Sequence, residues 1–219
     1  MPGVWACVKI VLLVFVPCGD VWTVGELSWR KGVMVYDILR YPDPRLKKTS
    51  EAVPPDDRQL AGLVDGLFET MYEYNGVGLA APQVGVLKRV VVVDTRRGGD
   101  EKIALVNPEI VACEGEELGE EGCLSLPELY APVRRAACIR VVARDLQGRP
   151  VEIEAEGFFA RVIQHEVDHL GGRLFIDHLD LITRQTLLNE WMRRMAGEGE
   201  GTAGVVRRDW RRDSGRRCI

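Results

Sequence analysis

The residues best suited to do chemistry lie in the segment QHEVDHL (164–170), where Glu166 stands between His165 and His169. On a helix, four residues rise about 6 Å and complete slightly more than one turn, so both histidines project from one face. Two imidazoles at that spacing can bind one metal ion. Glu166 lies about 100° around the helix, where it would flank a water molecule rather than bind the ion. The segment therefore predicts two ligands of a hydrolytic metal site, although so short a pattern also arises by chance.

The third protein ligand decides which kind of site this is. In the pattern HExxHxxGxxH the last ligand would fall at Phe175, which cannot bind a metal. A thermolysin-like zinc protease would instead use a glutamate on a later helix. Glu190 stands 21 residues beyond His169 and keeps that alternative open, although a glutamate on a helix is commonly a solvated charge.

Cys123 in EEGCLSLP (120–127) is the candidate before the helix. Its acidic neighbours Glu120 and Glu121 would raise the pKa of the thiol, which argues against a free nucleophile. A coordinating thiol, however, is deprotonated by the ion itself. The residues alone therefore favour Cys123 over Glu190 by a modest margin and leave both open.

These residues must be positioned by a mixture of helices and antiparallel strands. Apolar spacing predicts helices over 57–74, 157–170 and about 181–195, the second ending at Gly171 and Gly172. Between the first two we expect a glycine-rich loop at 76–85, a buried strand at 86–95, a turn at 96–100 and a strand at 102–111 broken at Pro108. Alternation around DLQG in 136–157 predicts a β-hairpin. The fold class is α+β, with antiparallel sheets and hairpins around a central metal-binding helix and a helix towards each end.

Composition sets broad limits. The chain has 219 residues, 46% of them hydrophobic, and a formal net charge of −4, which suits one globular domain and argues against binding to nucleic acid through overall charge. None of the six cysteines forms a CxxC pair, so we expect a reducing compartment rather than a disulfide framework.

Both ends of the chain differ from the middle. The apolar run at 10–16 is too short to span a bilayer, and no clear signal-peptide cleavage site follows it. We interpret residues 1–33 as an extension outside the catalytic domain, read from upstream of a true start at Met34. The catalytic domain is expected over 34–197. Residues 198–219 are expected to form a disordered, Arg-rich tail.

Three blocks occur in the same order as in a known family. GVGLAAPQVG (76–85), EEGCLSLP (120–127) and QHEVDHL (164–170) resemble the signature blocks of the bacterial-type peptide deformylases, GxGLAAxQ, EGCLS and QHExDHL. The flanking segments YPDPRLKK, VNPEI and GRLFIDHL are also similar, so the resemblance runs from Met34 through the last predicted helix. It does not extend to 1–33 or to the Arg-rich tail.

The resemblance implies a complete metal site. Cys123, His165 and His169 would bind one divalent metal, Fe²⁺ first, with Zn²⁺, Ni²⁺ or Co²⁺ able to take its place. Glu166 would accept a proton from water and deliver it to the leaving amine. The side-chain amide of Gln83 and the backbone N–H of Leu124 would stabilise the oxyanion of the transition state.

The same resemblance implies where a peptide would bind. The substrate backbone would pair near Gly78, because Gly76 and Gly78 allow close approach and positive φ angles. Val77 and Val162 are candidates for an apolar pocket around the methionine side chain, and both could equally be core residues.

The implied reaction is hydrolysis of the N-formyl group of N-formyl-methionyl nascent chains, giving formate and a free N-terminal Met. Such a substrate comes from bacterial-type ribosomes, so we expect a cytoplasmic protein without a membrane or a specific nucleic-acid partner. It is taken as a monomer by default. A transient contact of the basic tail with the ribosome is the alternative to a solvated tail. The rival functions are a zinc endopeptidase using Glu190 and a non-catalytic relative that keeps the fold.

Overall fold

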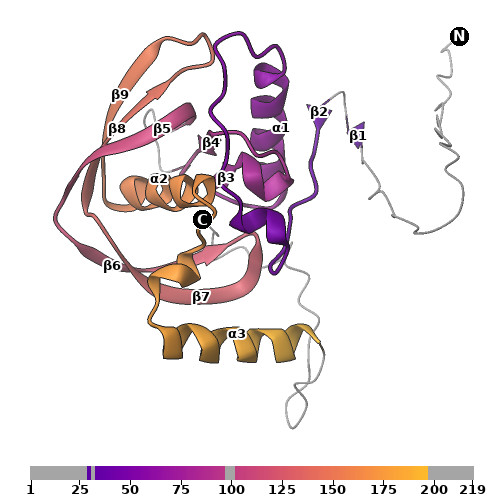
Figure 1. Ribbon diagram of the computed structural model, residues 1–219, viewed down its shortest axis with the longest axis vertical. Helices are drawn as coiled ribbons and strands as arrows, with labels where there is room; N and C mark the ends of the chain where they lie inside the picture. The colour runs from indigo at the N-terminus through magenta and orange to yellow at the C-terminus, as the bar shows by residue number, and fades with distance from the viewer. Residues whose placement is uncertain (1–28, 31–32, 97–101, 197–219) are drawn as a thin grey trace, which may run out of the picture.

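The computed structural model describes residues 29–30, 33–96 and 102–196 (Figure 1). Its α-helices are α1 (Leu60–Glu73), α2 (Gly157–Leu170) and α3 (Leu181–Met195). Three 3-10 helices accompany them, η1 (Pro44–Lys47), η2 (Ala81–Val84) and η3 (Phe175–His178). The strands are β1 (Trp29–Arg30), β2 (Val33–Met34), β3 (Gly78–Ala80), β4 (Val90–Val93), β5 (Ile103–Glu114), β6 (Glu117–Cys123), β7 (Leu126–Arg135), β8 (Cys138–Arg144) and β9 (Pro150–Glu156). None of the described helices has both the length and the apolar character needed to cross a bilayer.

The largest sheet has five strands in the order β3-β4-β5-β8-β9, and every neighbouring pair is antiparallel. All four valines of β4 are fully buried, because this strand lies between two helices. Val91 and Val93 pack with the core around α2, whereas Val90 and Val92 pack with the core around α1. Because successive side chains of a strand point to opposite faces, β4 packs against a core on each face of the sheet.

Helix α2 runs through the middle of the molecule, between the five-stranded sheet and the ribbon of β6 and β7 (Figure 1). It starts directly after β9 at Gly157, whose φ of 55° lies in the left-handed region. It ends at Gly171, and Gly172 follows with a φ of 69°. A Cβ at Gly172 would lie 2.5 Å from the carbonyl oxygen of Lys47, so the chain turns away from α2 in a space that admits only glycine.

The β6–β7 ribbon has its own core on the side away from the large sheet. Leu126, Leu129 and Val133 of β7 pack there with η3 and α3. The indole nitrogen of Trp191 in α3 donates to the carbonyl of Pro127 at 2.7 Å and fastens the helix to the ribbon. Cys123, the last residue of β6, belongs to this core.

The predicted class and helices are confirmed. Predicted helix 57–74 is α1, and the other two helices have the predicted bounds. The hairpin is β8–β9, joined at Asp145–Gly148. Residues 97–100 of the predicted turn, most of 1–33 and all of 198–219 lie outside the described residues.

Three predictions about strands were wrong or incomplete. Pro108 does not break its strand, because β5 continues through a register shift between Val106 and Glu109. The expected loop 76–85 contains β3 and η2. Strands β6 and β7 were missed, because β6 carries four charged or glycine positions in succession and β7 contains two prolines.

Candidate metal centre

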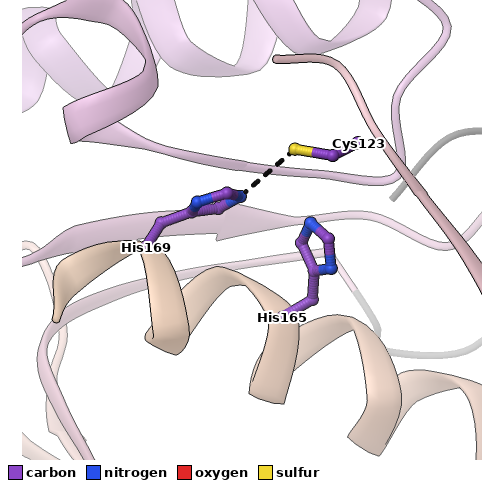
Figure 2. Close-up of side chains that lie close together, drawn as sticks. All are labelled: Cys123, His165 and His169. Carbon is purple, nitrogen blue, oxygen red and sulfur yellow. Dashed lines mark hydrogen bonds between the residues drawn. The ribbon is translucent and has the colours of Figure 1, made fainter. Parts of the chain in front are cut away.

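Helix α2 presents His165 and His169 from one face, as the spacing predicts (Figure 2). Their ring centroids are 4.9 Å apart, with an angle of 82° between the ring planes. Both side chains are 1% exposed. Burial and the neighbouring His165 lower the pKa of His169 well below its usual value, so its imidazole is neutral and able to act as a ligand.

Cys123 approaches the two histidines from the end of β6 (Figure 2). Its Sγ lies 3.4 Å from Nε2 of His169, and one ligand atom from each of the three residues lies within 4.8 Å of the others. Nε2 of His165 is buried and has no hydrogen-bond partner. A thiolate and two imidazoles suit Fe²⁺ or Zn²⁺, so this unpaired nitrogen and its neighbours fit a metal ion.

Glu121 and Phe175 fix the orientation of the His165 ring. Its Nδ1 lies 2.9 Å from Oε2 of Glu121, and the ring of Phe175 stacks against it with centroids 6.2 Å apart. Because Glu121 can only accept, Nδ1 carries the proton and the lone pair of Nε2 is directed towards the site. Phe175, which the sequence excluded as a ligand, thus helps to hold one.

Glu121 has a different role from the one that the sequence predicted. Its carboxylate faces His165, Arg135 and Arg161, whereas the sequence suggested an acidic neighbour acting on the thiol of Cys123. Burial would raise the pKa of Glu121, but hydrogen bonds from His165 and Arg135 hold it well below its usual value. Glu120 is exposed. No local pattern could have indicated this, because Arg135 and Arg161 are 14 and 40 residues away in the chain.

Glu166 is 0% exposed, and neither carboxylate oxygen has a hydrogen-bond partner. Burial, reinforced by the charge of Glu121, raises its pKa well above the usual value. An ideal Cβ at Gly78 would lie 2.5 Å from Oε1 of Glu166, so the glycine makes room for this carboxylate. A buried, unpaired carboxylate with a raised pKa is suited to exchanging protons.

Gln83 lies in η2 and faces the cluster. Its Oε1 accepts from the backbone N–H of Ala80 at 2.8 Å, which fixes the orientation of the amide. Its Nε2 donates to Sγ of Cys123 at 3.5 Å and to Oγ of Ser125 at 3.3 Å. Gln83 is therefore both a loop anchor and an amide donor directed at the site.

The remaining predicted residues are less close to the chemistry. Leu124 lies in the turn between β6 and β7, directly after Cys123. Val77 and Val162 are 0% exposed and belong to the core around α2, so their role in a methionine pocket stays a prediction. Gly76 and Gly78 do not have positive φ angles, contrary to expectation.

The competing ligand is not part of the cluster. Glu190 is exposed on α3, and the group of candidate ligands found among the described residues contains Cys123 instead. The endopeptidase alternative is therefore not favoured.

Comparison with known proteins gives one consistent family. A family model described as polypeptide deformylase matches residues 35–185. A peptide deformylase of Alkalilimnicola ehrlichii is 45% identical over 171 residues, which cover 78% of this chain and 96% of that protein.

Solved structures agree with this result. A peptide deformylase from Legionella pneumophila is 42% identical, with a TM-score of 0.69 over 76% of this chain and 99% of that chain. A class I type b peptide deformylase from Acinetobacter baumannii, solved with Met-Ala-Ser bound, is 39% identical, with a TM-score of 0.63 over 66% of this chain and 98% of that chain.

Proposed function

The chain belongs to the peptide deformylase family and is a deformylase, and we propose that it hydrolyses the N-formyl group of N-formyl-methionyl nascent polypeptides to formate and a free N-terminal Met. The observation that carries this proposal is the meeting of Cys123, His165 and His169 beside the buried carboxylate of Glu166. A non-catalytic relative would have no use for such an unpaired carboxylate, which is costly to bury.

We propose that Sγ of Cys123 and the Nε2 atoms of His165 and His169 hold one divalent metal. Iron(II) is proposed first, with zinc, nickel or cobalt able to occupy the same ligands, since this donor set accepts all of them. When bound, such a metal lowers the pKa of water from 15.7 to about 7 and supplies a nucleophile at neutral pH.

Glu166 moves the protons in this proposal. It accepts a proton from the attacking water and then delivers it to the nitrogen of the leaving amine as the C–N bond breaks. Its raised pKa favours the first step, because a more basic carboxylate takes up a proton more readily and holds it until the amine leaves.

Gln83 and Leu124 stabilise the negative charge that develops on the formyl oxygen. The amide of Gln83 is already oriented by Ala80, so little reorganisation is needed when the charge appears. The backbone N–H of Leu124 is the second proposed donor. Loss of one such donor typically costs about 10²–10³ in rate.

The peptide is proposed to add to the edge of the large sheet at β3. This strand ends the order β3-β4-β5-β8-β9, so one edge of Gly78–Ala80 is not paired within that sheet. An extended peptide can form main-chain hydrogen bonds with such an edge. The Met-Ala-Ser bound to the Acinetobacter relative supports a peptide of this kind, and Val77 and Val162 remain the proposed lining of its methionine pocket.

The setting of the reaction is part of the proposal. We place the enzyme in a bacterial-type cytoplasm, acting as a monomer on chains leaving the ribosome. A transient ribosome contact of residues 198–219, which lie outside the described part of the chain, stays the alternative to a solvated tail.

The test is an anaerobic assay with formyl-Met-Ala-Ser, combined with metal analysis of the same samples. We expect formate release and about one metal per native chain, on the basis of a single three-ligand site. Cys123→Ala should lose both, whereas Glu190→Ala should keep both. Metal and activity retained in Cys123→Ala would contradict the proposed site.

A further inference from the structure

Arg161 is a charged residue in an interior position that the proposed reaction does not use. It precedes His165 by four residues and therefore lies on the same face of α2. Its side chain is 5% exposed. Arginine is almost never buried to this extent unless its guanidinium is paired, so its partners indicate its role.

The guanidinium joins α2 to the β6–β7 ribbon. Its Nη1 donates to Oε1 of Glu121 and to the carbonyl of Val133, both at 2.9 Å. Its Nη2 donates to the carbonyl of Glu117 at 2.8 Å. One side chain thus contacts both strands of the ribbon, and its one charged partner within the described part of the chain is the carboxylate that holds His165.

Gly119 provides the space for this guanidinium. An ideal Cβ on Gly119 would lie 2.8 Å from Cζ of Arg161 and 2.9 Å from its Nε and Nη2. Any side chain at Gly119 would push the guanidinium away from its acceptors. The glycine is needed for this contact and not for a turn, because it does not have a positive φ angle.

Two arginines hold the carboxylate of Glu121. Arg135 donates to both oxygens of Glu121, at 2.9 and 3.0 Å, and its Nη1 also donates to Asp168 at 2.5 Å. The carboxylate of Glu121 therefore faces the guanidiniums of both Arg135 and Arg161, and these two partners hold it in place against Nδ1 of His165.

We propose that Arg161, in the recess left by Gly119, is a positioning residue of the metal centre. It fixes Glu121, and Glu121 fixes the ring of His165, so that Nε2 is directed at the site before an ion arrives. This inference rests on the proposed function and deepens it, since it assigns residues that prepare one of the three ligands.

The test is the zinc affinity of the metal-free protein, measured by competition with a chelator. Arg161→Met removes the guanidinium but keeps an apolar stem, and Gly119→Ala displaces the guanidinium without removing it. Each should weaken zinc binding by about 10–100-fold, the usual cost of losing an outer partner of a ligand. The zinc affinity of Arg161→Lys should lie between those of native protein and Arg161→Met, because lysine keeps the positive charge but lacks the planar guanidinium that donates several hydrogen bonds at once.

The decisive comparison is the double variant. If Gly119 acts only by admitting Arg161, then Gly119→Ala should cost little further affinity in the Arg161→Met background. Equal losses in both backgrounds, or native affinity in Arg161→Met, would overturn the proposal. If Arg161→Met does not fold, native affinity in both Gly119→Ala and Arg161→Lys would overturn it in the same way.

Two controls separate this effect from general damage. Arg134→Met removes an arginine of the same ribbon whose partner, Glu116, is exposed, and it should leave zinc affinity unchanged. Gly62→Ala adds a methyl group with no atom within 4 Å and should also have no effect. A native protein that binds no zinc would instead contradict the proposed metal site itself, so the two failures are distinguishable.

Discussion

Helices α2 and α3 have similar lengths, 14 and 15 residues, and carry two candidate metal ligands and one, respectively, but their surroundings differ completely. Ten residues of α2 are buried, including its glutamine, both histidines, Glu166 and Asp168. In α3 only Leu188 and Trp191 are buried. A glutamate is therefore buried in one helix, as Glu166, and exposed in the other, as Glu190.

The difference comes from what encloses each helix. Around α2, buried polar groups are paired one by one: the amide of Gln164, for example, bonds both the N–H and the carbonyl of Ala136 at 3.0 Å. Nε2 of His165 and both carboxylate oxygens of Glu166 have no hydrogen-bond partner, and the proposed reaction uses these three atoms. Helix α3 contacts the ribbon along one side, so Glu190 meets water and has no reason to bind an ion.

Glu166→Gln, on α2, should cause the largest loss of activity among these substitutions. The amide has the size of the carboxylic acid but cannot exchange the proton, so we expect kcat to fall by about 10²–10⁴. Metal content should stay native, because Glu166 is not a ligand in the proposed site. The measurement is formate release alongside metal analysis, and an equal loss of metal and activity would mean that Glu166 helps to bind the ion.

Asp168→Asn should have a smaller effect that depends on pH. Burial would raise the pKa of Asp168, but hydrogen bonds from His178 and Arg135 lower it to about 2, from 3.8 in the unfolded chain. The folded state then binds fewer protons, so this stabilisation is present above pH 4 and is lost as the pH falls towards 2. A shift of this size corresponds to about 2 kcal/mol.

Urea unfolding of the metal-free protein at several pH values between about 6 and 3 measures this contribution. The difference in unfolding free energy between native protein and Asp168→Asn should shrink as the pH falls. Asp65→Asn on α1 is the control, because it makes the same change at an exposed position and should give a difference that does not vary in this way with pH. A difference that is independent of pH would contradict the assigned pairing of Asp168.

Glu190→Ala should have the smallest effect. An exposed substitution without a special contact changes the free energy of unfolding by less than about 0.5 kcal/mol. Leu188→Ala on the same helix should cost clearly more, because Leu188 is 7% exposed and packs in the ribbon core. A strong loss of metal in Glu190→Ala would remove the distinction between the two helices.

Much of the fold follows from local patterns. Apolar spacing gave all three helices, two of them with the observed bounds, because each buries one stripe of side chains against a neighbouring layer. The ribbon could not be found in this way. Strand β6 buries Glu121 where a pattern expects an apolar residue, and that burial is possible only with Arg135 and Arg161 from later elements.

The sequence alone determined the family resemblance and two of the three candidate ligands. The spacing of His165 and His169 placed them on a shared helix face, and the residue type excluded Phe175, because the ability to bind a metal is a property of the side chain itself. The tertiary structure decided the rest: which candidate reaches the histidines, where Glu166 is isolated from partners, and how Gly119 admits Arg161 to hold Glu121. These depend on contacts between segments far apart in the chain, which no local pattern encodes.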